Sequence, residues 1–205
     1  MVAYLALWPL QQDKRPRTVE FQRVEWNSGD ASQTHSIAGV VATSSDRSRM
    51  TRMRYANRIF LLFVTDQGEG RSIYNRSLNT SYLIDDRERR VTVYPCTCTW
   101  ESSEWPVDSV CGGAAKQYNP DLVPVEWSRV AETPVIRYRA LNLARFTEVA
   151  FAPSANCDLF EEFKIEFGFR LEKSYSHFKV TKYTPGEPPL RLFTPPSTYE
   201  FEEKQ

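Results

Sequence analysis

The sequence predicts a mostly β protein of the α+β class, built as a curved antiparallel sheet or half-barrel with a few helices covering an apolar face. Two observations lead to this prediction. Residues 161–172, EEFKIEFGFRLE, alternate between apolar and polar side chains, and a period of two is typical of a half-buried antiparallel strand. Segments rich in β-branched and aromatic residues also recur between polar breaks about every 8–12 residues, as in sandwiches and barrels. The apolar residues of the alternating segment are Phe163, Ile165, Phe167, Phe169 and Leu171.

The first half of the chain is expected to be a meander of strands. A strand is predicted at residues 35–44, with Gly39 marking a bulge or bend. The run from Ile59 to Val64 is apolar throughout, which predicts a strand covered on both faces, and DQGEG at 66–70 is expected to form a turn. The further strands are predicted at residues 71–75, 80–86 and 89–96.

One helix is expected in the second half, between Arg139 and Ala150. Leu143, Phe146 and Ala150 recur at helical spacing there, and no proline interrupts the segment. A strand at residues 134–141 is expected to precede this helix.

The C-terminal quarter is expected to be a hairpin followed by extended loops. SYS at 174–176 is predicted to be the turn, and residues 177–183 the returning strand. In the proline-rich end, short edge strands are predicted at Leu190–Phe193 and Thr198–Phe201.

The composition indicates a single domain over residues 1–205 with a substantial core, since 41% of the residues are hydrophobic and 13% are aromatic. Residues 1–18 are expected to be a truncated leader or a flexible N-terminal segment. Their apolar run has no preceding positive charge and no clear cleavage pattern. It is also shorter than the ~20 apolar residues that a membrane-spanning helix needs, so no membrane span is expected.

The net charge gives no reason to expect a nucleic-acid partner. Lys plus Arg and Asp plus Glu number 26 each, whereas nucleic-acid-binding domains are basic overall or on one face. The arginines between Arg47 and Arg58 come without aromatic stacking residues. They are expected to form the solvated side of a strand.

Two sequence features indicate an extracellular protein or the ectodomain of a secretory-pathway protein. Asn75 and Asn79 begin two N-glycosylation patterns in a polar stretch that is expected to be an exposed turn. The cysteines are even in number, which suits disulfides in an oxidising compartment. The four cysteines are Cys96, Cys98, Cys111 and Cys157.

The preferred disulfide pairing is Cys96–Cys111 with Cys98–Cys157, and the reverse assignment is nearly as good. Cys96 and Cys98 share one face of an extended strand, so a bond between them would be strained. Two other interpretations are free core thiols and a zinc site. A zinc site is disfavoured because Cys-x-Cys and two distant histidines do not match zinc-ligand spacing.

No catalytic, metal-binding or cofactor-binding motif is present, so the protein is expected not to be an enzyme and to carry no metal or cofactor. The acidic pairs Asp85-Asp86 and Glu161-Glu162 are expected to be solvated surface residues. His35 and His177 are expected to lie on the surface or to be hydrogen-bonded.

The predicted function is that of a non-catalytic extracellular binding module holding lipid or another apolar ligand in a sheet-lined cavity. The predicted lining is the alternating apolar set from Phe163 to Leu171 described above. The alternative is an extracellular domain that binds protein or glycan. In that case the same side chains are solid core, because alternation looks identical in both cases.

Residues 53–96 resemble the central meander of secreted animal proteins with a LolA-like domain. The resemblance lies in Arg54-Tyr55-Ala56-Asn57-Arg58, Ile73-Tyr74-Asn75, Tyr82-Leu83-Ile84 and Cys96, and in Phe193, Pro196 and Tyr199 near the end. Ala56 stands where an acidic residue is expected. The resemblance implies a half-barrel of antiparallel strands closed by helices over an apolar cavity, with no catalytic residues and no metal.

Overall fold

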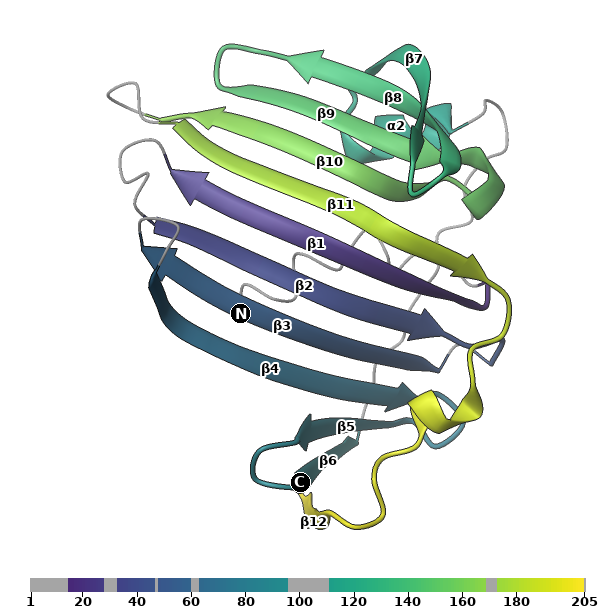
Figure 1. Ribbon diagram of the computed structural model, residues 1–205. Coiled ribbons are helices and arrows are strands. Elements are labelled where there is room, and N and C mark those ends of the chain that lie inside the picture. Colours follow the sequence, from purple (N-terminus) through teal and green to yellow (C-terminus); the bar gives the residue numbers. More distant parts are fainter. Residues whose placement is uncertain are drawn as a thin grey trace.

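A computed structural model describes residues 15–27, 33–46, 48–59, 63–95, 111–168 and 173–204 (Figure 1). The described residues form one twelve-stranded sheet, a short α-helix and two 3-10 helices. The elements are β1 (Arg17–Asn27), β2 (Gln33–Thr43), β3 (Arg49–Ile59), β4 (Phe63–Asn75), β5 (Thr80–Asp85), β6 (Arg90–Pro95), α2 (Gly112–Tyr118), β7 (Val123–Val130), β8 (Thr133–Leu141), β9 (Arg145–Ala152), η2 (Pro153–Ala155), β10 (Asp158–Phe167), β11 (Lys173–Pro185), η4 (Leu190–Phe193) and β12 (Glu200–Glu203).

The sheet consists of two antiparallel meanders joined side by side. The strand order is β12-β6-β5-β4-β3-β2-β1-β11-β10-β9-β8-β7. Strands β1 to β6 form the first meander and β7 to β11 the second, and they meet where β11 pairs antiparallel with β1. The chain then crosses the sheet through η4 and adds β12 parallel to β6 at the far edge. This open, curved sheet confirms the predicted mostly β, half-barrel-like fold.

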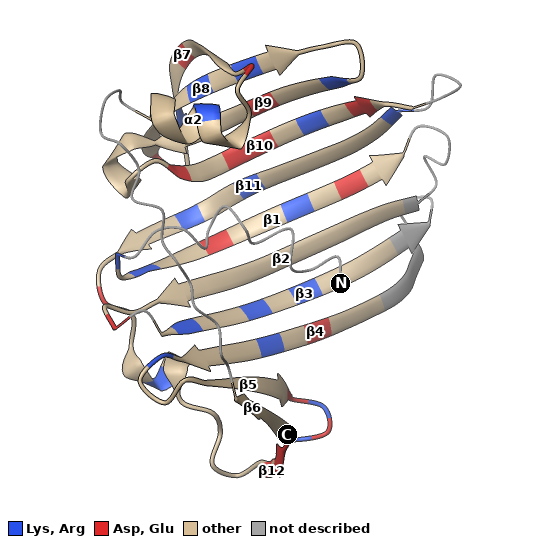
Figure 2. Cartoon of the chain, turned by 180° about the vertical axis from the view of Figure 1, so that it is seen from behind, with Lys and Arg blue, Asp and Glu red and all other residues tan. Residues whose placement is uncertain are grey.

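The sheet has a hydrophobic core on each of its faces, at opposite ends. Alternation along β2 shows this directly, because Ile37 and Val41 join one core while Val40 and Ala42 join the other. The larger core lies on the face where α2 packs, which we call the α2 face (Figure 2). The smaller core lies on the opposite face, beneath η4, and contains Ala42, Met50, Ile73, Ile84, Val91 and Phe193.

Gly39 and Gly68 lie inside the strands β2 and β4, where the sequence predicted interruptions. A Cβ at Gly39 would lie 2.8 Å from the ring of Phe21, so this glycine accommodates a packed ring, and the pairing of β2 continues through it without a bulge. The DQGEG segment is not a turn but part of the thirteen-residue strand β4. There Gly68 leaves room for the ring of Tyr55 on the neighbouring strand. Residues 60–62 of the apolar run from Ile59 to Val64 lie outside the described residues. Ile59 on β3 pairs antiparallel with Phe63 on β4, so the two ends of this run belong to different strands.

The predicted helix between Arg139 and Ala150 is wrong. The segment is the end of β8, a turn and most of β9. Leu143, which supplied part of the helical spacing, is fully exposed in the turn. The Asn142 side-chain oxygen organises that turn by accepting hydrogen bonds from the backbone N–H groups of Ala144 and Arg145, at 3.0 and 2.8 Å.

The C-terminal hairpin is confirmed, but residues 174–176 are not its turn. Strands β10 and β11 pair antiparallel, with Phe167 opposite Lys173, so SYS at 174–176 belongs to β11. The expected edge strand at Leu190–Phe193 is the 3-10 helix η4. The last predicted strand corresponds to β12.

A disulfide joins Cys111 to Cys157, with sulfur atoms 2.01 Å apart. The preferred pairing and its reverse are therefore both wrong. Cys111 precedes α2 and Cys157 lies in the turn before β10, so the bond ties α2 to its face of the sheet. Cys96 and Cys98 lie outside the described residues. In the described ranges, no helix is long and apolar enough to cross a membrane.

Candidate ligand-binding face

A row of apolar and aromatic side chains crosses five neighbouring strands on the face opposite α2. Leu141 on β8 pairs with Phe146 on β9, which pairs with Ile165 on β10. The row continues through Tyr175 on β11 to Trp26 on β1. Together with Phe163, which packs edge-on against the Phe146 ring at 6.2 Å, these residues form what we call the aromatic band: Leu141, Phe146, Phe163, Ile165, Tyr175 and Trp26.

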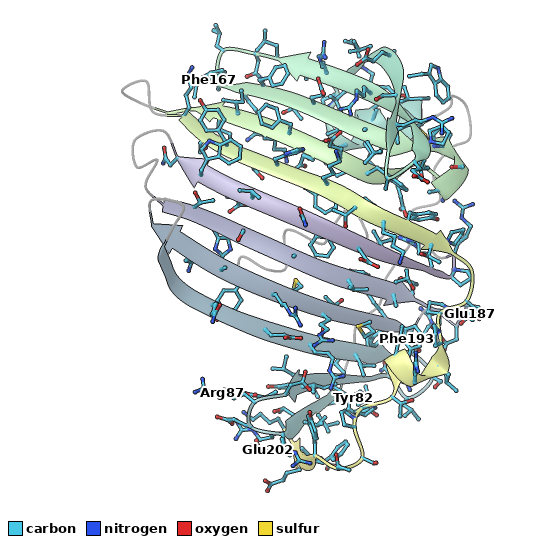
Figure 3. All side chains as sticks on the ribbon, in the orientation of Figure 1. Tyr82, Arg87, Phe167, Glu187, Phe193 and Glu202 are labelled. Carbon is cyan, nitrogen blue, oxygen red and sulfur yellow. A yellow bond between two sulfur atoms is a disulfide. The ribbon has the colours of Figure 1, made fainter. Side chains whose placement is uncertain are left out.

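The aromatic band is accessible to solvent. Leu141 is 74% exposed, and the other five side chains are half-buried. The rings of Trp26 and Tyr175 stack in parallel, with centroids 5.0 Å apart and planes 3° apart. Figure 3 looks onto this face, with Phe167 near one end of β10. Helix α2 lies on the other side of the sheet, so the band presents apolar surface that this helix does not cover.

A cluster of charged side chains borders the band on the same face. Arg137 bridges two carboxylates, with nitrogen–oxygen distances of 2.9 Å to Glu148 and 2.6 Å to Glu161. Arg139 binds Glu148 at 2.5 Å, and His177 Nε2 lies 3.0 Å from Glu161 Oε1. With Lys179, 3.8 Å from the same oxygen, these residues form what we call the charged row: Arg137, Arg139, Glu148, Glu161, His177 and Lys179.

The charged row holds Glu161 in its ionised form. Burial acts to raise the pKa of the Glu161 carboxyl, but hydrogen bonds from His177 and Arg137 and the charges of Arg137 and Lys179 outweigh it, so the pKa lies below its ordinary value. Burial likewise acts to lower the pKa of Arg137, but its bonds to Glu161 and Glu148 leave that pKa raised. Glu161 and Arg137 therefore form a fixed pair of opposite charges at ordinary pH.

The structure separates the five residues that were predicted to line a ligand pocket. Phe163 and Ile165 belong to the aromatic band. Phe167, 38% exposed, lies at the end of β10 with the Lys173 ammonium 5.7 Å from its ring centroid. Phe169 and Leu171 fall outside the described residues. A ligand-binding role for these side chains stays a prediction.

Sequence reasoning missed the other members of the band. Trp26 was overlooked, although the alternation of Val24 and Trp26 with polar residues in β1 was readable. Phe146 was assigned to a helix, and Tyr175 to a turn. Their proximity depends on strand register, which brings β1 beside a strand about 150 positions later.

The acidic pairs predicted to be solvated have different environments. Glu161 and Glu162 are buried, at 8% and 4% exposure, because each finds a cationic partner on its own face of the sheet. Asp85, by contrast, is exposed and accepts hydrogen bonds from the backbone N–H groups of Arg87 and Glu88, both at 2.9 Å. Asp86 binds Arg71 at 2.8 Å.

The remaining predicted positions are also placed by the structure. His35 is half-buried and contacts the side-chain oxygen of Asn57. The stretch with the two glycosylation patterns is an exposed turn between β4 and β5, as expected. Asn75 accepts hydrogen bonds from Ser77 and Leu78, and Asn79 is exposed. Their glycosylation stays a prediction. Among the described residues, no group of side chains is arranged to hold a metal ion.

The α2 face carries a hollow of about 1070 Å³ beside the C-terminal end of α2, which we call the α2 hollow. Its lining comes from β1, β9, β10 and β11, from the end of α2 and the connection that follows it, and from the turn between β8 and β9. The lining includes Arg23, Tyr118, Thr147, Glu162, Lys164 and Phe178. Polar and charged side chains thus line much of this hollow, together with apolar ones, in contrast to the aromatic band.

Comparison with known proteins gives structural likenesses only. No protein-family model and no curated protein matches the chain. LprF from Mycobacterium bovis superposes with a TM-score of 0.44 at 10% identity, covering 96% of this chain and 98% of LprF. The LolA superfamily protein NE2245 from Nitrosomonas europaea gives 0.34 at 7% identity, covering 94% and 97%.

PNGF-II gives a TM-score of 0.35 at 9% identity over 93% of this chain. The match covers 32% of PNGF-II, so the chain spans about a third of that protein's length. A LolA superfamily protein is therefore among the structural neighbours, while membership of the secreted animal proteins stays a prediction. Likenesses at these scores and identities assign neither a family nor a function.

Proposed function

We propose that the protein is a non-catalytic extracellular binding module that holds a ligand with a long apolar part, such as a lipid, against the aromatic band. The observation that carries this proposal is the solvent-accessible row of apolar and aromatic side chains across five strands. Soluble proteins rarely expose a contiguous apolar patch, and where they do the patch marks a binding surface. The charged row beside it would meet the polar part of the ligand.

The dimensions of the band suit an extended chain. Neighbouring strands lie about 4.8 Å apart, so five strands span roughly 19 Å. A buried methylene contributes about 0.8 kcal/mol, and a chain lying on a surface buries about half of its area. About ten methylenes would then contribute roughly 4 kcal/mol. This is enough for weak binding, and an ion pair with Arg139 or Lys179 would strengthen it.

An extracellular location is part of the proposal. The Cys111–Cys157 disulfide supports it, because structural disulfides persist mainly in oxidising compartments. The exposed turn that carries Asn75 and Asn79 supports it as well, because glycosylation requires an accessible acceptor.

A protein partner is the second candidate, and the composition of the surface favours it specifically. Interface centres are enriched in Trp, Tyr, Phe and Arg, which the band and the charged row supply.

Native mass spectrometry of the protein secreted from eukaryotic cells, before and after organic extraction, tests the proposal. We expect a lipid-sized mass that extraction removes, and glycan mass at Asn75 or Asn79. A fluorescent long-chain fatty acid then serves as the probe for variants. We expect Trp26→Ala to weaken its binding at least fivefold, because the variant removes one end of the band.

Trp127→Ala is the matched control, since Trp127 is 65% exposed on β7 and lies outside the band. Equal effects of the two substitutions would contradict binding at the band. A protein that carries no lipid and takes up none of the fatty acid would favour the protein partner instead.

A further inference from the structure

The α2 hollow contains buried hydroxyl groups that the protein leaves without partners. Thr147 is 1% exposed and lines the hollow, and its Oγ1 has no hydrogen-bond partner among the described residues. The hydroxyl of Tyr118, at the C-terminal end of α2, is likewise buried and unpartnered in the described chain. Buried hydroxyls are nearly always hydrogen-bonded, because an unpaired one loses its interactions with water without replacement. Two such groups lining one hollow indicate that a ligand supplies the missing partners.

The local structure fixes these groups in place. Thr147 on β9 pairs with Lys164 on β10, so their side chains stand side by side on the α2 face. The Tyr118 ring packs edge-on against Phe151 at 6.2 Å, and the Lys164 ammonium lies 5.1 Å from its centroid. Both hydroxyls are therefore carried by rigid, packed side chains. Preorganisation of this kind lowers the entropic cost of binding.

The charges in the hollow are already neutralised by one another. The Lys164 ammonium lies 2.8 Å from the Glu162 carboxylate, which is buried. Arg23 binds Glu25 at 2.6 Å, since both project from the same side of β1.

Arg145 binds Glu166, also at 2.6 Å, across the β9–β10 pair. Each cation that lines the hollow thus has an acidic partner. A free anion would have to compete with these ion pairs, whereas a neutral hydroxyl can join them as both donor and acceptor.

We propose that the α2 hollow binds a neutral, hydroxyl-rich ligand of the size of a mono- or disaccharide. The hydroxyls of Thr147 and Tyr118 bind ligand hydroxyls, and Lys164 and Glu162 offer a further donor and acceptor. Phe178, which also lines the hollow, contacts the apolar face of the ring. Pockets for small ligands measure about 300–1,000 Å³, and the hollow, at about 1070 Å³, is large enough. The site lies on the sheet face opposite the aromatic band, so it is independent of the function proposed above.

Saturation-transfer NMR on the full chain tests this inference, with glucose, galactose, mannose, N-acetylglucosamine, maltose and lactose as probes. We expect transfer to at least one of these sugars. Titration with that sugar should give an affinity at least tenfold higher than with its uronic acid or phosphate counterpart. Thr147→Val and Tyr118→Phe should each weaken binding at least tenfold. Both should leave the melting temperature unchanged or raise it, because each removes a buried hydroxyl that has no partner in the protein.

Ser176→Ala is the matched control. Ser176 also carries a buried hydroxyl without a described partner, on β11, but does not line the hollow. We expect it to bind the sugar as the wild type does. The inference is overturned if none of the six sugars shows transfer, if Thr147→Val binds as tightly as the wild type, or if the charged counterparts bind more tightly than the neutral sugars.

Discussion

At the scale of single residues, Glu161 shows how a buried charge is kept on a sheet face. Three cationic or hydrogen-bonding side chains converge on it, two from the neighbouring strand β11 and one from β8: His177, Lys179 and Arg137. A buried carboxylate with such partners is stabilised only while it is ionised. Its contribution to folding therefore depends on pH.

We expect Glu161→Gln to lower the free energy of unfolding by about 1.5–3 kcal/mol at neutral pH, the range for hydrogen bonds to charged groups. The folded pKa of Glu161 lies below its ordinary value of 4.5. Its contribution is therefore fully present above pH 4.5 and is lost as the pH falls through the folded pKa. Urea unfolding between pH 3 and 7 measures this. The gap between wild type and variant should narrow below pH 4.5, and a constant gap would contradict the assignment.

Gly39 illustrates a residue whose lack of a side chain is a packing requirement. A Cβ there would lie 2.8 Å from both the Phe21 ring and the Arg52 carbonyl oxygen. We expect Gly39→Ala to destabilise the protein by about 1–3 kcal/mol, the usual cost of overpacking. Gly70→Ala is the control. A Cβ at Gly70 meets nothing within 4 Å, and Ala in a strand is favoured over Gly by about 0.5–1 kcal/mol. Thermal melts that ranked the two variants in the reverse order would refute this.

At the scale of elements, local sequence patterns predicted well where strands form, but predicted poorly which strands lie side by side in the sheet. The alternation in EEFKIEFGFRLE was sufficient to predict the β10–β11 hairpin. The helix predicted between Arg139 and Ala150 failed because Leu143, which lies in a turn, happened to fall at helical spacing from Phe146 and Ala150 on β9. The aromatic band could be predicted only in part. Phe163 and Ile165 follow from period two, but the placement of Trp26 beside Tyr175 depends on a strand register set by distant parts of the chain.

The seven-residue helix α2 depends on its tether. A helix this short is not stable in isolation, and the disulfide from Cys111 fixes its start to the turn that holds Cys157. We expect the double variant Cys111→Ala/Cys157→Ala to be about 2–4 kcal/mol less stable. Hydrogen exchange should show the amides of Ala115 and Asn119, which donate to Cys111 and Ala115, losing protection before those of β10. Unchanged protection of α2 would show that packing alone holds it.

At the scale of the whole molecule, the sheet is covered on different faces at its two ends. The α2 core covers one face at the β8–β11 end. The C-terminal segment covers the opposite face at the β3–β6 end, where Phe193 is 5% exposed. This segment is anchored at several points (Figure 3). Glu187 accepts a hydrogen bond from the Ser45 N–H at 3.0 Å, and the Tyr199 hydroxyl donates to Asp86 at 2.9 Å. The segment therefore links β11 to the far edge of the sheet.

This arrangement makes about the last nineteen residues part of the fold rather than a tail. A substitution at Phe193 tests this. Phe193 contacts a core contributed by β2 to β6, so we expect Phe193→Ala to cost about 3–5 kcal/mol, as for other buried phenylalanines. Leu190→Ala, three residues earlier in the same 3-10 helix and 81% exposed, should change stability by less than about 0.5 kcal/mol. Chemical denaturation followed by tryptophan fluorescence gives both values.

If the segment is essential to the sheet, Phe193→Ala should also shift the unfolding of the whole protein as one transition, because β6 and β12 form the edge that it secures. A separate early transition, with the remaining sheet unfolding as in the wild type, would show that the C-terminal segment is a dispensable cover.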